Sequence, residues 1–136
     1  MKSKLLILSV MIAFTALSCK QNTTPQQVET AKPADNQKMI IAKISVKPEN
    51  IEEFINAAQT IIKNSNEEEG CMEYNLFQSP YNKSNFVFVE KYVNQAAIDF
   101  HFGTTYFKEF GSVSSGWTSA PAEIKIYDIS GERTAN

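Results

Sequence analysis

The segment that most constrains the fold is Phe86–Tyr92, whose first four residues read FVFV. Side chains of a strand point alternately to its two faces, so a strand that is apolar at consecutive positions needs cover on both faces. Helices can cover one face of a small sheet. We expect the other face to pack against a second copy of the chain, giving a homodimer. The alternative is that the C-terminal tail or the loop 111–121, which contains Trp117, folds over that face.

The hydrophobic periodicity on either side of this segment predicts one small α+β domain. Asn50 followed by Glu53 is typical of a capping box, and Asn94 and Thr104 are expected to cap two short helices. The order is β-α-β-β-α-β, which is the ferredoxin-like arrangement. The expected elements are strand 40–46, helix 51–62, strand 71–78, hairpin loop 79–85, strand 86–92, helices 95–102 and 105–110, loop 111–121 and strand 123–129.

The first eighteen residues have the pattern of a signal peptide. Lys2 and Lys4 precede the apolar run Leu5–Leu17. As a helix this run would span about 20 Å, which is short of the ~30 Å hydrocarbon core of a membrane. The run ends in ALSC, which resembles a lipobox and predicts lipidation of Cys19. The alternative is ordinary signal cleavage without lipidation.

The remaining chain divides into a tether, a domain and a tail. Residues 19–38 are polar and contain two prolines, which indicates a flexible tether. The domain spans 39–129, and we expect residues 130–136 to be a disordered tail. We therefore predict a protein of the cell envelope that is attached to the membrane only through its lipid anchor, with a periplasmic domain.

Charge and cysteine content exclude several classes of function. The chain has 13 basic and 15 acidic residues. Removal of residues 1–18, which hold two lysines, changes the net charge from −2 to −4. An acidic chain is not expected to bind nucleic acid, because its net negative charge repels the phosphates. With Cys19 lipidated, Cys71 is the one remaining thiol, so neither an internal disulfide nor a cysteine-based metal site is expected.

Motifs between residues 68 and 107 resemble those of the antibiotic biosynthesis monooxygenase family, in particular its small quinol-oxidising branch. Residues 68–80 read EEGCMEYNLFQSP and residues 86–92 read FVFVEKY, followed by Ala97, His101 and Phe107. The family pattern is E-x-G-C-x-x-Y, a Q-x-P turn, an F-V-x-x-E-x-aromatic strand and an A-x-x-x-H helix. The resemblance covers about residues 39–129. It implies a dimer that closes a shared β-barrel, with a pocket between sheet and helices in each subunit.

The resemblance also implies chemistry and shows where this chain departs from it. Several members oxidise phenols or quinols with O₂ and no cofactor, and others degrade heme. Heme-degrading relatives carry an axial histidine about ten residues after the position of His101, where this chain has Gly111. Relatives often have a second histidine just before the position of Phe107, where this chain has Tyr106. We therefore expect no heme, no other cofactor and no bound metal.

His101 is the single imidazole of the chain and is the candidate general base, since an imidazole exchanges protons near neutral pH. Glu90 shares a strand face with three aromatic residues, so we expect it to be paired or to have a raised pKa, and to assist His101. The alternatives are structural hydrogen bonds for both. Glu67–Glu69 are expected to be a solvated helix end. The candidate residues for lining the pocket, which could equally be core, are Tyr74, Asn75, Phe100 and Tyr106.

Two functions are compatible with these observations. The first is a cofactor-independent monooxygenase that uses O₂ to oxidise a small aromatic substrate, quinol-like or polyphenolic. The second is a non-catalytic module that binds a small molecule or responds to envelope stress on the same dimeric fold, because fold alone does not fix function.

Overall fold

The computed structural model describes residues 36–135. The predicted signal peptide, the predicted lipidation site Cys19 and most of the predicted tether lie outside the described residues. Within the described part of the chain, no helix is long and apolar enough to cross a membrane.

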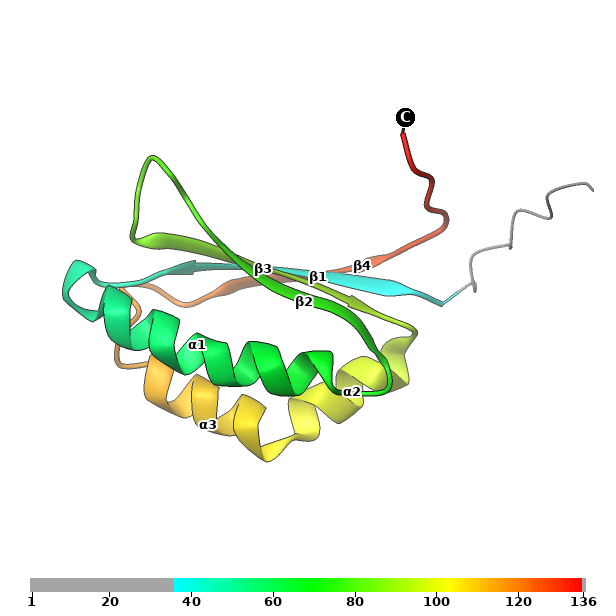
Figure 1. The fold of residues 1–136 in the computed structure, drawn as a ribbon, viewed down its shortest axis with the longest axis horizontal. Helices are drawn as coiled ribbons and strands as arrows, with labels where there is room; N and C mark the ends of the chain where they lie inside the picture. Colours follow the sequence, from blue (N-terminus) through cyan, green and yellow to red (C-terminus); the bar gives the residue numbers. More distant parts are fainter. Residues whose placement is uncertain (1–35, 136) are drawn as a thin grey trace, which may run out of the picture. The chain divides into compact units, whose positions relative to one another are not determined.

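The described residues form one four-stranded antiparallel sheet with its helices on a single face (Figure 1). The strand order is β2-β3-β1-β4, which confirms the predicted α+β, ferredoxin-like class. The elements are β1 (Lys38–Ser45), a short 3-10 turn (Pro48–Asn50), α1 (Ile51–Asn66), β2 (Cys71–Gln78), β3 (Asn85–Tyr92), α2 (Gln95–Gly103), α3 (Thr105–Ser114) and β4 (Glu123–Asp128).

The core lies between this sheet and the helices, and β3 is at its centre. Phe86 and Phe88 of β3 point to the helices, and the Phe54 ring of α1 lies 5.0 Å from Phe86 and 6.4 Å from Phe88. Glu90 is the next residue on the same face of β3, opposite Ile40 of β1. The pattern that predicted a buried strand therefore also places a carboxyl group inside the domain.

The helix caps agree with the sequence in two places and differ in a third. Asn94 accepts a hydrogen bond from the amide of Ala97 at 2.9 Å, and Thr104 caps α3, as predicted. The side chain of Asn50 makes no cap hydrogen bond, so the predicted capping box is wrong. The reason is the 3-10 turn before α1, in which the amide of Asn50 bonds to the carbonyl of Lys47 at 3.0 Å.

Helix α3 runs four residues past its predicted end at Phe110. Glycine inside a helix is unfavourable by about 1 kcal/mol relative to alanine. Here Ser114, three residues after Gly111, is buried, and the ring of Phe110, just before the glycine, lies 5.6 Å from the ring of Phe54. Tertiary packing on both sides of the glycine therefore outweighs its local preference.

The face of the sheet opposite the helices is an open face that no helix of the described residues covers (Figure 1). This open face is partly apolar. Phe77 is 57% exposed, and it pairs with Val87, while Val89 pairs with Ile41; these three aliphatic residues are partly exposed. Trp117 packs against the core cluster between sheet and helices, so the alternative in which loop 111–121 covers the open face is wrong.

The C-terminal segment lies at one end of this open face and covers only part of it. Ile129 is tied to the sheet by a hydrogen bond from its amide to the carbonyl of Gln37 at 2.9 Å. Beyond it, the carboxylate of Glu132 pairs with Lys91, which lies on the open face next to Val89. Phe77 of β2 and Tyr127 of β4 remain exposed on this face.

Candidate active site

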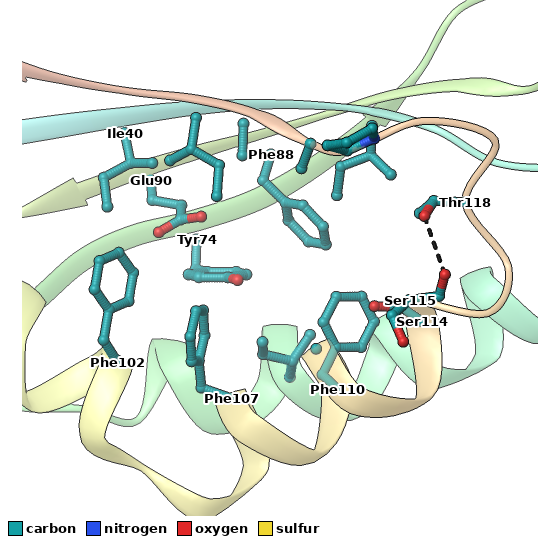
Figure 2. A pocket seen from close by; sticks show the side chains of 17 residues that line it. Ile40, Tyr74, Phe88, Glu90, Phe102, Phe107, Phe110, Ser114, Ser115 and Thr118 are labelled. Carbon is teal, nitrogen blue, oxygen red and sulfur yellow. Dashed lines mark hydrogen bonds between the residues drawn. The ribbon is translucent and has the colours of Figure 1, made fainter.

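A cavity of about 280 Å³ lies between the sheet and the helices (Figure 2). Figure 2 shows Glu90 and Tyr74 extending into it from the sheet, with Phe102, Phe107 and Phe110 facing them from the helices. Its volume is near the lower end of small-molecule sites, about 300–1,000 Å³, and suits a molecule of one or two rings. The lining residues are Ile40, Ala42, Ile44, Ile61, Tyr74, Phe88, Glu90, Phe102, Phe107, Phe110, Gly111, Ser114, Ser115, Thr118, Pro121, Ala122 and Ile124.

Glu90 is the carboxyl group of this cavity. It is 4% exposed, and burial raises its pKa from 4.5 to about 7, with a smaller contribution from the negative charge of Glu68. The hydroxyl of Tyr92 donates a hydrogen bond to Oε2 of Glu90 at 3.0 Å and partly offsets this rise in the pKa. A carboxyl group with a pKa near neutrality can both accept and release a proton under physiological conditions.

Tyr74 supplies the phenol of the cavity. Its side chain is 2% exposed, and its ring lies 5.4 Å from that of Phe88. Burial, followed by the nearby charge of Glu90, raises the pKa of Tyr74 above its ordinary value. The phenol therefore keeps its proton and can donate a hydrogen bond to an oxygen atom of a ligand.

His101 lies behind the cavity wall, and it is not one of the lining residues. Its side chain is fully buried, with its ring centroid 4.8 Å from that of Phe107 and 5.3 Å from that of Tyr74. These two rings do line the cavity. The structure therefore brings His101 and Glu90 to the same region but places only Glu90 at the cavity surface.

The hydrogen-bond partner of His101 is Glu68, which the sequence pattern wrongly predicted to be exposed to solvent. The three consecutive glutamates predicted a solvated helix end, yet the Glu68 side chain is 4% exposed and its Oε1 lies 2.8 Å from Nδ1 of His101. The hydroxyl of Tyr106 donates to the same Oε1. Glu68 is buried because α1 ends at Asn66 and the following turn folds the chain back onto α2 and α3.

Gly70 allows this turn to approach α2 closely. A Cβ atom at position 70 would lie 2.4 Å from the Cβ of Ala97, which is closer than two carbon atoms can approach. The carbonyl of Gly70 also accepts a hydrogen bond from the amide of Val93 at 3.0 Å. The missing side chain at Gly70 therefore lets the turn that carries Glu68 pack against α2.

The other predicted lining residues lie outside the cavity. Asn75 is exposed and pairs with Val89 on the open face, because neighbours in a strand point to opposite faces and Tyr74 points inward. Phe100 is 64% exposed on the outer side of α2. It lies with Tyr106 in a separate surface cleft.

The residues near the cavity do not suit a thiol nucleophile, a heme or a metal ion. Cys71 is half-buried, and burial with the charge of Glu68 raises the pKa of its thiol to about 12, so it stays protonated. Gly111 lines the cavity without a side chain, and His101 lies behind the cavity wall, so neither residue offers a ligand to a heme in the cavity. Within residues 36–135, no cluster of three or more His, Cys, Asp or Glu side chains could hold a metal ion.

Comparison with known proteins gives consistent results. An uncharacterized protein of Synechocystis, sll1783, is 37% identical over 134 residues, which cover 98% of this chain and 90% of that protein. YcnE of Bacillus subtilis, named a putative monooxygenase, is 37% identical over 89 residues, covering 65% of this chain and 94% of that protein. These similarities extend over nearly the full length of both relatives.

Solved structures share the fold. A conserved protein from Methanosarcina mazei matches with a TM-score of 0.67 and 29% identity, covering 70% of this chain and 94% of that one. Rv0793 from Mycobacterium tuberculosis matches in fold, with a TM-score of 0.68 and 19% identity, covering 72% of this chain and 99% of that one. The model of the antibiotic biosynthesis monooxygenase family matches residues 39–112, more than half of the chain. The chain therefore belongs to the antibiotic biosynthesis monooxygenase family, and this membership supports a general monooxygenase-like function.

Proposed function

We propose that the protein is a monooxygenase that oxidises a quinol-like or polyphenolic molecule of one or two rings with O₂ and without a cofactor. The observation that carries the proposal is a carboxyl group, Glu90, with a pKa of about 7 in the wall of an otherwise mainly apolar cavity. Such a group is suited to remove a proton from a phenolic hydroxyl. The similarity to YcnE, which is named a monooxygenase, also supports this activity.

The cavity residues divide the work of binding and proton transfer. The flat rings of Phe102 and Phe107 suit an aromatic substrate, because stacked and edge-to-face ring contacts are favourable. Tyr74 donates a hydrogen bond to one substrate oxygen, and Glu90 accepts the proton of another. Tyr92 bonds to Oε2 of Glu90, so Oε1 is the oxygen that takes the substrate proton.

The substrate supplies the electrons of the reaction. A hydroquinone and O₂ give a hydroxyquinone and water, so a ring C–H bond is replaced by a C–O bond and the other oxygen atom leaves as water. Four electrons pass from the ring to O₂, and no external reductant is needed. Loss of the phenolic proton makes the ring electron-rich, and the mainly apolar cavity limits access of water to the reactive anion.

This arrangement reverses the roles that the sequence predicted for two residues. The sequence favoured His101 as the base with Glu90 as its helper. Because Glu90 lines the cavity and His101 lies behind Tyr74 and Phe107, we assign substrate deprotonation to Glu90. His101 then has no direct contact with the substrate and can act only through the residues that line the cavity.

We also propose that the protein is a homodimer held to the envelope by a lipid on Cys19. The partly apolar open face, with Phe77 more than half exposed, is the surface that a second copy would cover. The two parts of this proposal are independent, since one concerns the sheet and the other the N-terminal segment.

One observation favours the non-catalytic alternative as a second candidate. Apart from Glu90 and Tyr74, the polar groups of the cavity are hydroxyls near its far end, from Ser114, Ser115 and Thr118. A cavity of this kind can bind a small aromatic molecule without turning it over. Binding and turnover therefore have to be measured on the same molecule.

Oxygen uptake by the full chain against a panel of hydroquinones and naphthoquinols tests the proposal. We expect consumption of one O₂ per quinol, and a fall in kcat of about 10²–10⁴-fold in Glu90→Gln, the usual contribution of a general base. Glu109→Gln removes an exposed carboxylate on α3 and should leave the rate unchanged. A wild type that oxidises none of the quinols of the panel, yet binds one of them in the cavity, would favour the non-catalytic alternative.

A further inference from the structure

We infer that Glu68 is the positioning residue of His101 and that, together with Tyr106, it holds the imidazole with its proton on Nδ1. The catalytic consequence rests on the proposed function, but the protonation of the ring does not. Two parts of the chain that are distant in sequence meet in this cluster: the turn after α1, and the junction between the end of α2 and the start of α3.

The geometry of the carboxylate fixes which nitrogen carries the proton. Oε1 of Glu68 accepts a hydrogen bond from Tyr106, and it lies 2.8 Å from Nδ1 of His101. The hydrogen bond from the Tyr106 hydroxyl favours the ionised carboxylate, which has no proton of its own to donate. This places the proton between Oε1 and Nδ1 on the nitrogen. Nδ1–H therefore donates to Oε1, as in the carboxylate–histidine pairs that orient metal-ligating histidines.

The other ring nitrogen is then left as an acceptor. Nε2 of His101 is buried and has no hydrogen-bond partner among residues 36–135. The rings around it include Tyr74 and Phe107, which line the cavity, and Tyr92, which bonds to Glu90. The unpartnered acceptor thus belongs to a ring that lies one side chain away from the cavity.

Burial makes the pair sensitive to charge. Both side chains are almost fully buried, at 0% for His101 and 4% for Glu68. A second proton on the imidazole would be balanced directly by the carboxylate of Glu68, which an exposed carboxylate could not do as well. The ionisable groups that surround the ring are Glu68, Tyr74, Tyr92 and Tyr106, with Glu90 beyond Tyr92.

In the proposed reaction this pair would hold a proton close to the cavity. Glu90 takes a proton from the substrate, and the protons must later reach the oxygen atom that leaves as water. An imidazole with a fixed Nδ1–H and an open Nε2 can accept one proton and return it without rotating. Glu68 does not touch the cavity, so its part is to orient His101 and to balance its charge.

The single histidine of the chain makes a direct test possible. In full-length protein labelled with ¹⁵N-histidine, NMR identifies which ring nitrogen carries a proton. We expect Nδ1 to be protonated in the wild type at neutral pH. In Glu68→Gln, which keeps the shape but removes the charge, the Nδ1–H proton resonance should move upfield, because the hydrogen bond weakens.

Two further variants keep the test decisive if Glu68→Gln does not fold. Tyr106→Phe removes the competing donor, so the Nδ1–H bond should shorten and its resonance should move downfield, opposite to Glu68→Gln. Glu67→Gln, an exposed neighbouring carboxylate, should leave the histidine resonances unchanged. A wild-type ring protonated only on Nε2, or unchanged resonances in the folded Glu68→Gln and Tyr106→Phe variants, would overturn the inference.

Turnover separates this inference from the proposed function. With any quinol that the wild type oxidises, Glu68→Gln should lower kcat by about 10- to 100-fold, the range for a residue that orients a histidine. KM should change little, because Glu68 does not line the cavity. An equal effect on kcat in Glu67→Gln would argue against a specific role. If no quinol is oxidised, the NMR result still decides the protonation of His101.

Discussion

Glu90→Gln should stabilise the protein above neutral pH while it removes the proposed base. In the folded chain the pKa of Glu90 is about 7, against 4.5 for a carboxyl group in the unfolded chain. The folded state therefore binds this proton more tightly. Its contribution to stability is fully present below pH 4.5 and is lost as the pH rises through about 7.

The size of this effect follows from the two pKa values. A rise from 4.5 to about 7 corresponds to roughly 3 kcal/mol, at 1.36 kcal/mol for each pH unit. Glutamine carries no charge and can still accept the hydrogen bond from Tyr92. At about pH 8 the variant should therefore exceed the wild type in stability by up to about 3 kcal/mol, and at about pH 4 the difference should vanish.

Urea unfolding of the wild type and Glu90→Gln at both pH values measures this difference. Glu109→Gln serves as the control, since an exposed substitution usually changes stability by less than about 0.5 kcal/mol. If the difference in free energy of unfolding between Glu90→Gln and the wild type is the same at both pH values, Glu90 is not a buried group with a raised pKa. The base assignment would then lose its main support.

Three further predictions concern other parts of the chain. Gly70→Ala should destabilise the domain by about 1–3 kcal/mol in urea unfolding, because its Cβ would overlap that of Ala97, and adding Ala97→Gly should restore most of the loss. Val89→Glu should convert the proposed dimer to monomers in light scattering, whereas Gln59→Glu on the exposed side of α1 should not; a monomeric wild type would refute the dimer. Cys19→Ser should release the protein from the membrane fraction, and unchanged attachment without an acyl mass would refute lipidation.

The sequence was sufficient for the fold because its signals are local. The FVFV segment indicated a central strand, and the period of two placed Glu90 on the same face as Phe86 and Phe88. The caps at Asn94 and Thr104 act within three residues of themselves, so they could be located without a structure. The same period of two should have placed Asn75 opposite Tyr74, on the outer face.

The site could not be derived in full because its decisive contact is not local. Glu68 and His101 are 33 residues apart, and the run of three glutamates around Glu68 is locally typical of a solvated helix end. Burial of Glu68 depends on the close approach of Gly70 to Ala97, which no spacing along the chain reveals. The last four residues of α3 were missed for a similar reason, because the packing of Phe110 and Ser114 against the core extends the helix past Gly111.

The two buried carboxyl groups have different surroundings, and this difference assigns their roles. Glu68 has two donors on one oxygen, from His101 and Tyr106, and lies behind the cavity. Glu90 has one donor, Tyr92, and faces an apolar space that raises its pKa. Carboxyl groups whose environments differ in this way can hold separate roles in one reaction. Because the charge of Glu68 contributes to the raised pKa of Glu90, replacing Glu68 by glutamine should also lower the pKa of Glu90.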